Sequence, residues 1–420
     1  MARTDRTSLV FLIMISLTPI LSIHFPRFLA FWPLIIGLTF TLYSMILRKE
    51  KFNIPTLYYK IVGVISALCL ISTLWSIAPA EAFEDAIKAS AILLLGGLFV
   101  GTCKNIDAKN FTPYWWLFPA ATICAALLCA FDLATDLALY KILHTKTELD
   151  RVNTSVMNRG LVCLIFAYFI SFFFLTHAKS KYKTVMTVAL TGAVILALSQ
   201  SQSQSAQLAL IAGIMFFFLF PAQYRKIYWA FGISIIVAML LTPVITSYLF
   251  SFLAGNAQSE WLNIEPDTHA EAAPWLYNAY IGNRAEIWDF VTKYALNNPL
   301  YGFGIEATKY VPLFEHAHIF HTEDTILHPH NFSVQIWIEF GLVGVAAFSA
   351  VIIALLKEMA LLPQNTSKRI STTLLFITLL FASMTYGLWQ SWWLGELIFI
   401  ASLCVLFVTM PVSPKAGQKS

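Results

Sequence analysis

Charged side chains are scarce in this chain of 420 residues: only 12% are Asp, Glu, Lys or Arg, whereas 58% are hydrophobic. The mean hydropathy of +0.70 excludes an ordinary water-soluble domain. The six cysteines lie in or beside apolar segments, so no disulfide framework is indicated. The sequence also has no GxxxxGK[ST] motif and no nucleic-acid signature. This composition indicates a membrane protein.

Long apolar runs fill most of the chain. A helix of about 20 apolar residues spans a bilayer, and the first such run is not followed by a signal-peptide cleavage site. We predict an all-α, polytopic membrane helix bundle of about 12 transmembrane helices, forming a single domain over residues 1–420. The predicted spans lie near residues 8–24, 28–47, 57–75, 87–102, 113–133, 158–177, 185–199, 206–221, 228–248, 336–356, 371–388 and 393–410.

The distribution of Lys and Arg predicts the orientation. If the N-terminus is cytoplasmic, most of the 27 Lys and Arg residues fall in short inside loops, such as RKEK at 48–51 and KSKYK at 179–183. Because positively charged loops stay in the cytoplasm, we expect both termini there. The outside then holds long polar segments near 134–157 and 249–335. The second is predicted to be a partly helical periplasmic loop subdomain between spans 9 and 10.

Three consecutive patterns organise this loop. The stretch NRAEIWDFVTKYAL at 283–296 has apolar residues at helical spacing and is stopped by NNP. LYGFG at 300–304 supplies two glycines that suit a tight turn close to other backbone. HPHN at 328–331 then leads directly into the apolar run of span 10.

His330 is the first candidate for chemistry because imidazole exchanges a proton near neutral pH and can act as a general base for a hydroxyl. Pro329 makes the approach to His330 stiff. His328 and Asn331 are supporting candidates, and Asn331 would either orient a ligand or cap the following helix. The alternative is that all three residues only cap this helix and contact lipid headgroups.

Cations on the outer side are few, and an ionisable group at the surface of a spanning bundle is a functional candidate. Lys88 and Arg159 stand where two spans begin, and Arg151 and Arg284 lie in outer segments. Guanidinium groups match phosphate oxygens, so converging cations would bind a diphosphate. The alternative is that they reach lipid headgroups. Gln202, in the Ser/Gln-rich turn after span 7, would line a pocket or bond between helices.

A metal site has two candidate sets of ligands. Five histidines lie in the segment 316–330 together with Glu323 and Asp324, but their spacing is not a zinc pattern and HExxH is absent. Glu84 and Asp85 would hold a divalent cation beside a leaving diphosphate, yet no partner carboxylate stands at a helpful spacing. We therefore expect neither a metal nor a cofactor.

Two stretches, NRAEIWDFVTKYALNNPLYGFGIEA at 283–307 and HPHNFSVQIWIEFGLVG at 328–344, resemble the O-antigen ligase and O-antigen polymerase group of membrane glycosyltransferases. The first has Arg, Trp and Pro-Leu-x-Gly-x-Gly; the second has His-Asn, nine residues, Gly, two residues and Gly. NRG at 158–160 adds weaker support. Where the family commonly has Ser-Arg after span 7, this chain has Ser-Gln at Gln202. One cationic contact is thus missing, which gives Arg159 more of that role.

This resemblance implies an inverting, metal-independent glycosyltransferase of the bacterial inner membrane, with its active site facing the periplasm. The donor would be a glycan on undecaprenyl diphosphate, and the acceptor would be a hydroxyl of the lipid A core. In the family pattern, His330 activates the acceptor hydroxyl and Arg284 matches the loop arginine, while Lys88, Arg159 and Arg151 match diphosphate-binding positions. The expected partners are these two substrates and membrane lipids, without nucleic acid.

Other functions stay open from the sequence. An O-antigen or exopolysaccharide polymerase differs from a ligase only in its acceptor, a carrier-linked repeat. A transporter or flippase would also have twelve spans, but it should show inverted repeats and broken helices at the midplane. Instead, the polar candidates cluster at the outer surface. A protein oligosaccharyltransferase of the same group often carries a further C-terminal domain, and an acyltransferase would depend on a lone histidine. We prefer the ligase interpretation.

Overall fold

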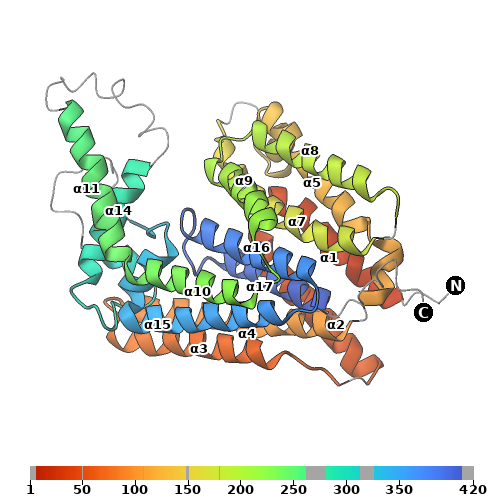
Figure 1. Cartoon of the computed structure of the whole chain (residues 1–420), viewed down its shortest axis with the longest axis horizontal. Coiled ribbons are helices and arrows are strands. Elements are labelled where there is room, and N and C mark those ends of the chain that lie inside the picture. The colour runs from red at the N-terminus through yellow and green to blue at the C-terminus, as the bar shows by residue number, and fades with distance from the viewer. Residues whose placement is uncertain are drawn as a thin grey trace.

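The computed structural model describes residues 6–49, 51–106, 108–147, 151–178, 180–261, 281–312 and 326–408, and every regular element in these ranges is a helix. The elements are α1 (Arg6–His24), η1 (Pro26–Ala30), α2 (Trp32–Leu42), η2 (Tyr43–Leu47), α3 (Thr56–Ser72), η3 (Thr73–Trp75), α4 (Pro79–Asn105), η4 (Ala108–Tyr114), α5 (Leu117–Ala134), α6 (Ala138–Leu143), η5 (Thr154–Met157), α7 (Asn158–His177), α8 (Lys183–Ser199), α9 (Gln204–Leu219), α10 (Arg225–Leu240), α11 (Thr242–Trp261), α14 (Ile281–Ala295), η7 (Ala307–Tyr310), α15 (Phe332–Leu361), α16 (Asn365–Ala382) and α17 (Ser391–Val408). The predicted all-α fold is confirmed (Figure 1).

The helices are those of a multi-pass membrane protein. Among the described residues, six helices are long and apolar enough to cross a membrane, or seven if the bent pair of α10 and α11 forms one span. Four further apolar helices are shorter, with 10–17 residues. A helix lies at each of the twelve predicted positions, but the number of 12 spans stays a prediction.

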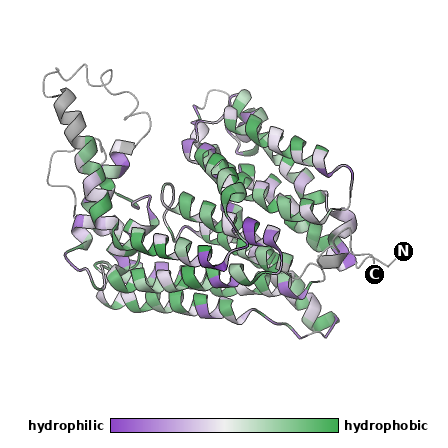
Figure 2. Ribbon diagram, in the orientation of Figure 1, coloured by the Kyte–Doolittle hydropathy of each residue, from purple (hydrophilic) through white to green (hydrophobic). Residues whose placement is uncertain are grey.

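Apolar side chains cover the outside of the bundle as well as its core. Phe218 is 67% exposed and Leu219 is 73% exposed, although both are large and hydrophobic. Figure 2 shows hydrophobic residues along most of the bundle helices, with many hydrophilic residues in the connecting segments. A surface of this kind suits contact with lipid rather than with water.

Helix α7 lies at the centre of the bundle. It packs against α1, α5 and α16, and 83% of its most apolar window is buried. Phe166 contacts the rings of Phe381 and Trp393, at centroid distances of 5.6 and 6.0 Å, and Phe173 stacks on Phe407 at 4.1 Å. A helix that is apolar on all sides is expected to be buried, and α7 follows that rule.

The predicted span 228–248 is wrong as a single helix, because the chain bends by 65° between α10 and α11. Pro243 lies at the break: it has no N–H to donate to the carbonyl of Met239, and its ring would collide with that carbonyl in a straight helix. The Met239 oxygen instead accepts a hydrogen bond from Trp337 Nε1 of α15, at 2.8 Å. The bend is therefore stabilised by a neighbouring helix.

The helix predicted at 283–296 is confirmed as α14, which packs against α11 and α15 (Figure 1). Helix α11 continues to Trp261, so it extends well into the segment expected to be loop. Residues 262–280 and 313–325, which include His316, His318 and His321, lie outside the described residues.

Candidate functional site

Helix α15 is interrupted at Gly341, where φ is 56° and ψ is −146°. The interruption frees two N–H groups and two carbonyls that an intact helix would join to each other. All four bond instead to the turn at 299–304. The bonds are Leu342 N to Pro299 O at 2.8 Å, Val343 N to Leu300 O at 3.1 Å, Phe303 N to Ile338 O at 2.8 Å and Gly304 N to Glu339 O at 2.9 Å. The turn thus replaces the missing helical hydrogen bonds.

Two glycines make this close approach possible. A Cβ atom on Gly341 would lie 2.5 Å from the carbonyl oxygen of Pro299, and one on Gly302 would lie 2.5 Å from the carbonyl carbon of Glu339. Both residues also have positive φ, which glycine adopts without steric cost. The two motifs recognised in the sequence, 299–304 and 328–344, are therefore complementary halves of one backbone junction.

His330 lies just before α15 and is fixed by its neighbours. Its φ of 55° is in the left-handed region, which is uncommon for a non-glycine residue and typical of functional sites. Its Nδ1 lies 2.6 Å from the carbonyl oxygen of Thr385. A carbonyl only accepts, so Nδ1 carries the hydrogen and Nε2 has the lone pair in the neutral ring. This tautomer suits a general base that acts through Nε2.

The α14 helix contributes to the same turn. Trp288 donates a hydrogen bond from Nε1 to the carbonyl oxygen of Pro329, at 2.7 Å. Arg284 lies one turn before Trp288 on this helix and is half-buried. Burial lowers the pKa of its guanidinium from the ordinary value. Arg284 is thus a partly desolvated cation on the helix that holds the His330 turn.

His328 stands beside His330, with ring centroids 4.2 Å apart. Burial lowers the pKa of His328 to about 4, and the charges of Lys309 and Arg159 add to this effect. Its Nε2 is buried without a hydrogen-bond partner among the described residues. His328 is therefore neutral at ordinary pH and supports the site as an uncharged ring.

Two cations, Arg159 and Arg284, lie near the loop that connects α16 and α17, residues 383–390. Burial raises the pKa of the Tyr386 hydroxyl above its ordinary value, and the charges of Arg159 and Arg284 act on it in the opposite direction. Arg159 also lies over the Trp392 ring, 5.8 Å from the centroid, and Trp392 packs edge-on against Tyr386 at 4.7 Å. The guanidinium groups of Arg159 and Arg284 thus both lie within electrostatic reach of the loop that binds His330.

A second cluster of charged side chains, Asp85, Glu306 and Lys309, lies near the N-terminal part of α4. Lys309 Nζ is 3.4 Å from Asp85 and 3.2 Å from Glu306. Burial raises the pKa of the Glu306 carboxyl, whereas Lys309 and Lys88 lower it. Lys88 itself is exposed. Lys88 therefore lies within electrostatic reach of the Glu306 carboxyl.

The other candidates have weaker links to His330. Asn331 is the N-cap of α15: its side-chain oxygen accepts hydrogen bonds from Ser333 N and Val334 N, as expected for a capping residue. Arg151 is exposed ahead of η5 and is not one of the charges that act on His328 or Tyr386. Gln202 is exposed in the turn between α8 and α9.

Neither metal hypothesis gains a ligand set from the described residues. Asp85 is paired with Lys309, and Glu84 is exposed. Within the described ranges, no three His, Cys, Asp or Glu side chains come together. Most of the histidine-rich segment falls in 313–325, outside those ranges.

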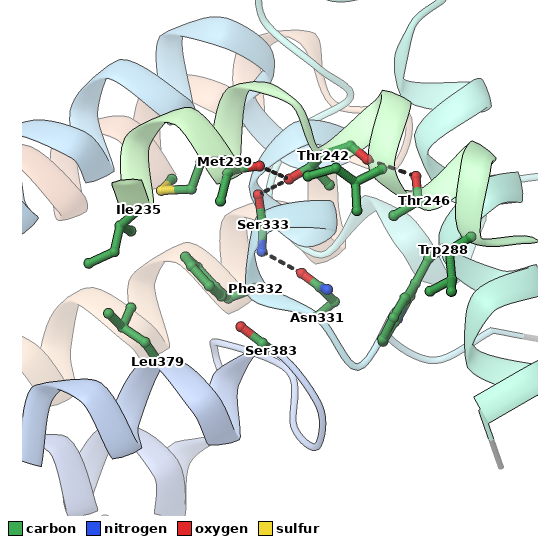
Figure 3. Close-up of a pocket in the computed structure, with 13 residues that line it drawn as sticks. Ile235, Met239, Thr242, Thr246, Trp288, Asn331, Phe332, Ser333, Leu379 and Ser383 are labelled. Carbon is green, nitrogen blue, oxygen red and sulfur yellow. Dashed lines mark hydrogen bonds between the residues drawn. The ribbon is translucent and has the colours of Figure 1, made fainter. Parts of the chain in front are cut away.

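An open, mainly apolar groove of about 270 Å³ begins beside the site. Figure 3 shows Asn331 and Trp288 towards one end of it, and Ile235 and Leu379 towards the other. The bend between α10 and α11 forms one wall, where Thr242 Oγ1 lies 2.6 Å from Ser333 Oγ. The groove is lined by Asn331 and not by His330 or Arg284. It adjoins the charged site without containing it.

Several residues of the site were not predicted. Thr385 acts through its backbone carbonyl, which leaves no trace in a sequence. Tyr386 and Trp392 stand in an aromatic-rich stretch, SMTYGLWQSWW, that looks like ordinary membrane-interface sequence. The clustering of polar and aromatic residues between the last two spans could have indicated these site residues. This signal is weak because aromatic belts are common at membrane interfaces.

Residues 187–349 match the family described as O-antigen ligase. The chain is 24% identical over 369 residues to a protein of Rickettsia conorii, covering 86% of this chain and 82% of that protein. It is 26% identical over 375 residues to a protein of Rickettsia bellii, covering 86% and 83%. Both bear the name "Putative polysaccharide ligase". The family match includes α10, α14 and the part of α15 that carries the break at Gly341.

Proposed function

We propose that this chain, which is similar to the O-antigen ligase family over residues 187–349, is a membrane glycosyltransferase that moves a glycan from undecaprenyl diphosphate to a hydroxyl of the lipid A core. The reaction would take place on the periplasmic face of the bacterial inner membrane, by an inverting and metal-independent mechanism. This proposal rests on the convergence of three side chains on the 383–390 loop. The Thr385 carbonyl accepts a hydrogen bond from His330, and the charges of Arg159 and Arg284 both act on the hydroxyl of the next residue, Tyr386.

The proposed step needs one base and a cationic pocket. His330 Nε2 takes the proton of the acceptor hydroxyl as its oxygen attacks the anomeric carbon of the donor. The bond from that carbon to the carrier oxygen breaks, and undecaprenyl diphosphate leaves with the electron pair. Arg159 and Arg284 stabilise the charge that develops on the diphosphate. Each group of this scheme approaches the 383–390 loop.

Lys88 and Arg151 take outer positions in this proposal. Lys88 would contact the diphosphate from the start of α4, where its charge already acts on Glu306. Arg151, which is exposed, would contact the donor before it is fully bound. The groove beside Asn331 supports a donor with an isoprenoid chain, because its lining is mostly apolar and one end adjoins the site.

Complementation tests the choice of acceptor. The gene is expressed in a bacterium that lacks its O-antigen ligase and, separately, in one that lacks its polymerase, and lipopolysaccharide is analysed by gel. We expect long chains attached to the core in the first strain. Restored chain length only in the second strain would make the protein a polymerase. A solute-uptake phenotype without either effect would favour a transporter.

The same assay tests the site. His330→Ala is expected to abolish attachment while the protein is still made, and His316→Ala is the control that we expect to be tolerated. Equal tolerance of both substitutions would remove the proposed base. Transfer by membranes is expected to persist in EDTA, and a loss that magnesium reverses would return attention to Glu84 and Asp85.

A further inference from the structure

Helix α15 carries a fully buried carboxylate that the proposed chemistry does not use. Glu339 has no exposed surface, and Gln335, one turn earlier on the same helix face, is 1% exposed. A buried acidic residue in an apolar helix is costly unless polar groups satisfy it, and such residues commonly serve function. The partners of Glu339 therefore indicate its role.

Its partners come from the 383–390 loop, from α15 itself and from the backbone of Glu306. Trp389 donates from Nε1 to Glu339 Oε2 at 2.6 Å, and Gln335 donates from Nε2 to Glu339 Oε1 at 2.7 Å. The other end of the Gln335 amide, Oε1, accepts from the backbone N–H of Leu388 at 2.9 Å. Helix α15 thus holds the end of this loop at two consecutive residues.

The same loop contacts both histidines of the site. The Thr385 carbonyl accepts from His330 Nδ1 at 2.6 Å. Thr385 is also held by α16, because its N–H and its hydroxyl donate to Phe381 O at 2.9 and 2.6 Å. At Gly387, an added Cβ would lie 3.2 Å from the Cβ of His328. Any shift of the loop would therefore move the groups that orient His330.

We propose that Glu339 and Gln335 are positioning residues for His330: they clamp the 383–390 loop, and the loop fixes the tautomer and direction of the imidazole. Neither side chain needs to touch a substrate. The clamp deepens the proposed function, since it names residues that act on the proposed base. Its structural consequence, a single tautomer at His330, does not depend on which reaction the protein performs.

The direction of each hydrogen bond decides which substitutions at 335 and 339 are compatible with the loop contacts. The Leu388 N–H and the Trp389 indole N–H only donate, and a carboxylate only accepts. Glu339→Gln keeps the volume but puts an amide NH₂ against one of two donors. Turning the Gln335 amide around would only move the conflict to the Leu388 N–H. No rotamer of the two amides satisfies both loop contacts and the contact between residues 335 and 339 at the same time.

Exchanging the two residues should remove this conflict. In the double variant Gln335→Glu/Glu339→Gln, the new carboxylate at 335 accepts from the Leu388 N–H and from the new amide at 339. The oxygen of that amide then accepts from the Trp389 indole. The exchange restores both loop contacts with the same two side-chain types in reversed order. A merely space-filling role would predict that Glu339→Gln alone is harmless.

Nitrogen NMR of protein labelled with ¹⁵N-histidine reports the tautomer of His330, which the clamp is proposed to fix. The His330 signals are assigned by their loss in His330→Asn. We expect the wild-type ring to carry its hydrogen on Nδ1 alone, Glu339→Gln to show both tautomers, and the exchanged double variant to return to one. Glu358→Gln, an exposed residue near the other end of α15, is the matched control and should leave the signals unchanged.

Transfer kinetics give the second readout. In Glu339→Gln we expect kcat to fall about tenfold or more with the donor KM changed less than about twofold, because orientation of the base and not donor binding is lost. The exchanged variant should recover most of kcat. If Glu339→Gln does not fold, Trp389→Phe removes one donor, keeps the carboxylate and carries the same two readouts.

The outcomes separate the two proposals. A single Nδ1–H tautomer at His330 in a folded Glu339→Gln or Trp389→Phe protein would overturn the clamp, whatever the activity. A mixed tautomer in Glu339→Gln that the exchange corrects supports the clamp. If that pattern is seen in a protein without glycan transfer, the proposed function fails while the clamp stands.

Discussion

The groove in Figure 3 is lined by the start of α15 and by the α10–α11 pair. Each of these helical segments is broken once, and the protein satisfies the two breaks in different ways. At Gly341, four backbone hydrogen bonds from the turn at 299–304 replace those lost from α15. At Pro243, one indole N–H, that of Trp337, satisfies the carbonyl that proline leaves free. The first break is filled by a segment about 40 residues away in sequence, and the second leaves α10 and α11 bent by 65°.

This difference separates a rigid junction from an opening. The junction at Gly341 ties the turn at 299–304 to α15 through backbone hydrogen bonds. The bend at Pro243 forms a wall of the apolar groove, whose lining residues include no titratable side chain. One break is thus closed by backbone hydrogen bonds, and the other borders an apolar groove. Four changes to the protein or its conditions test this difference.

Gly341→Ala is expected to have the largest effect. A methyl group would lie 2.5 Å from the Pro299 oxygen, in a backbone conformation that only glycine adopts readily. We expect the free energy of unfolding to fall by about 3 kcal/mol or more. Thermal unfolding of purified protein in detergent measures this loss. Gly192→Ala is the control, since nothing lies within 4 Å of an added methyl there. Equal melting temperatures for both variants would contradict the junction.

Acidification should affect the junction region through His328. The unfolded chain binds a proton on this ring below about pH 6.5, whereas the folded protein does so only below about pH 4. Above pH 6.5 the ring is neutral in both the folded and the unfolded protein, so it does not change the free energy of unfolding. This free energy then decreases progressively as the pH falls towards 4. This loss amounts to at most about 3 kcal/mol, from the size of the shift. His328→Gln should flatten the dependence of melting temperature on pH, and parallel curves would show that His328 is not buried as described.

Trp337→Phe should destabilise the bend between α10 and α11, with a smaller loss in the free energy of unfolding than Gly341→Ala causes. The substitution removes the donor to the Met239 carbonyl and leaves a buried ring. We expect a loss of about 1 kcal/mol in the free energy of unfolding. Trp116→Phe, at an exposed tryptophan, is the matched control. A loss no greater than that of the control would mean that water or lipid satisfies the carbonyl equally well.

Pro243→Ala is expected to change least. The Met239 carbonyl already has the Trp337 donor, and Thr242 remains bonded to Ser333, so the bend should persist with a stability change below about 1 kcal/mol. Spin labels at the exposed positions Val237 and Phe252 report the angle through their distance. A longer distance in the variant would show that proline alone imposes the bend.

Local sequence patterns predicted the elements well. The apolar runs located all twelve helical positions, and helical spacing with the NNP stop located α14. The bend after α10 was missed although Pro243 is visible in the sequence, because an apolar run that contains proline still reads as one span. The extension of α11 to Trp261 was missed because hydropathy marks the end of an apolar run and not the end of a helix.

The site was only partly predictable for a physical reason. His330, Asn331 and the glycines stand in short motifs whose spacing reflects local backbone geometry. The partners of His330 come from α14 and from the 383–390 loop, and the main contact is a backbone carbonyl. The four-bond junction at Gly341 also joins segments far apart in sequence. Tertiary contacts of this kind carry no signature that one sequence reveals.

The most direct test is transfer by purified protein in nanodiscs, with a labelled glycan on undecaprenyl diphosphate as donor and lipid A core as acceptor. We expect labelled lipid A core and free undecaprenyl diphosphate in equal amounts. We also expect His330→Ala to lower this rate about a hundredfold or more, as loss of a general base does, with the fold retained. Transfer by His330→Ala at the wild-type rate would show that His330 is not the base.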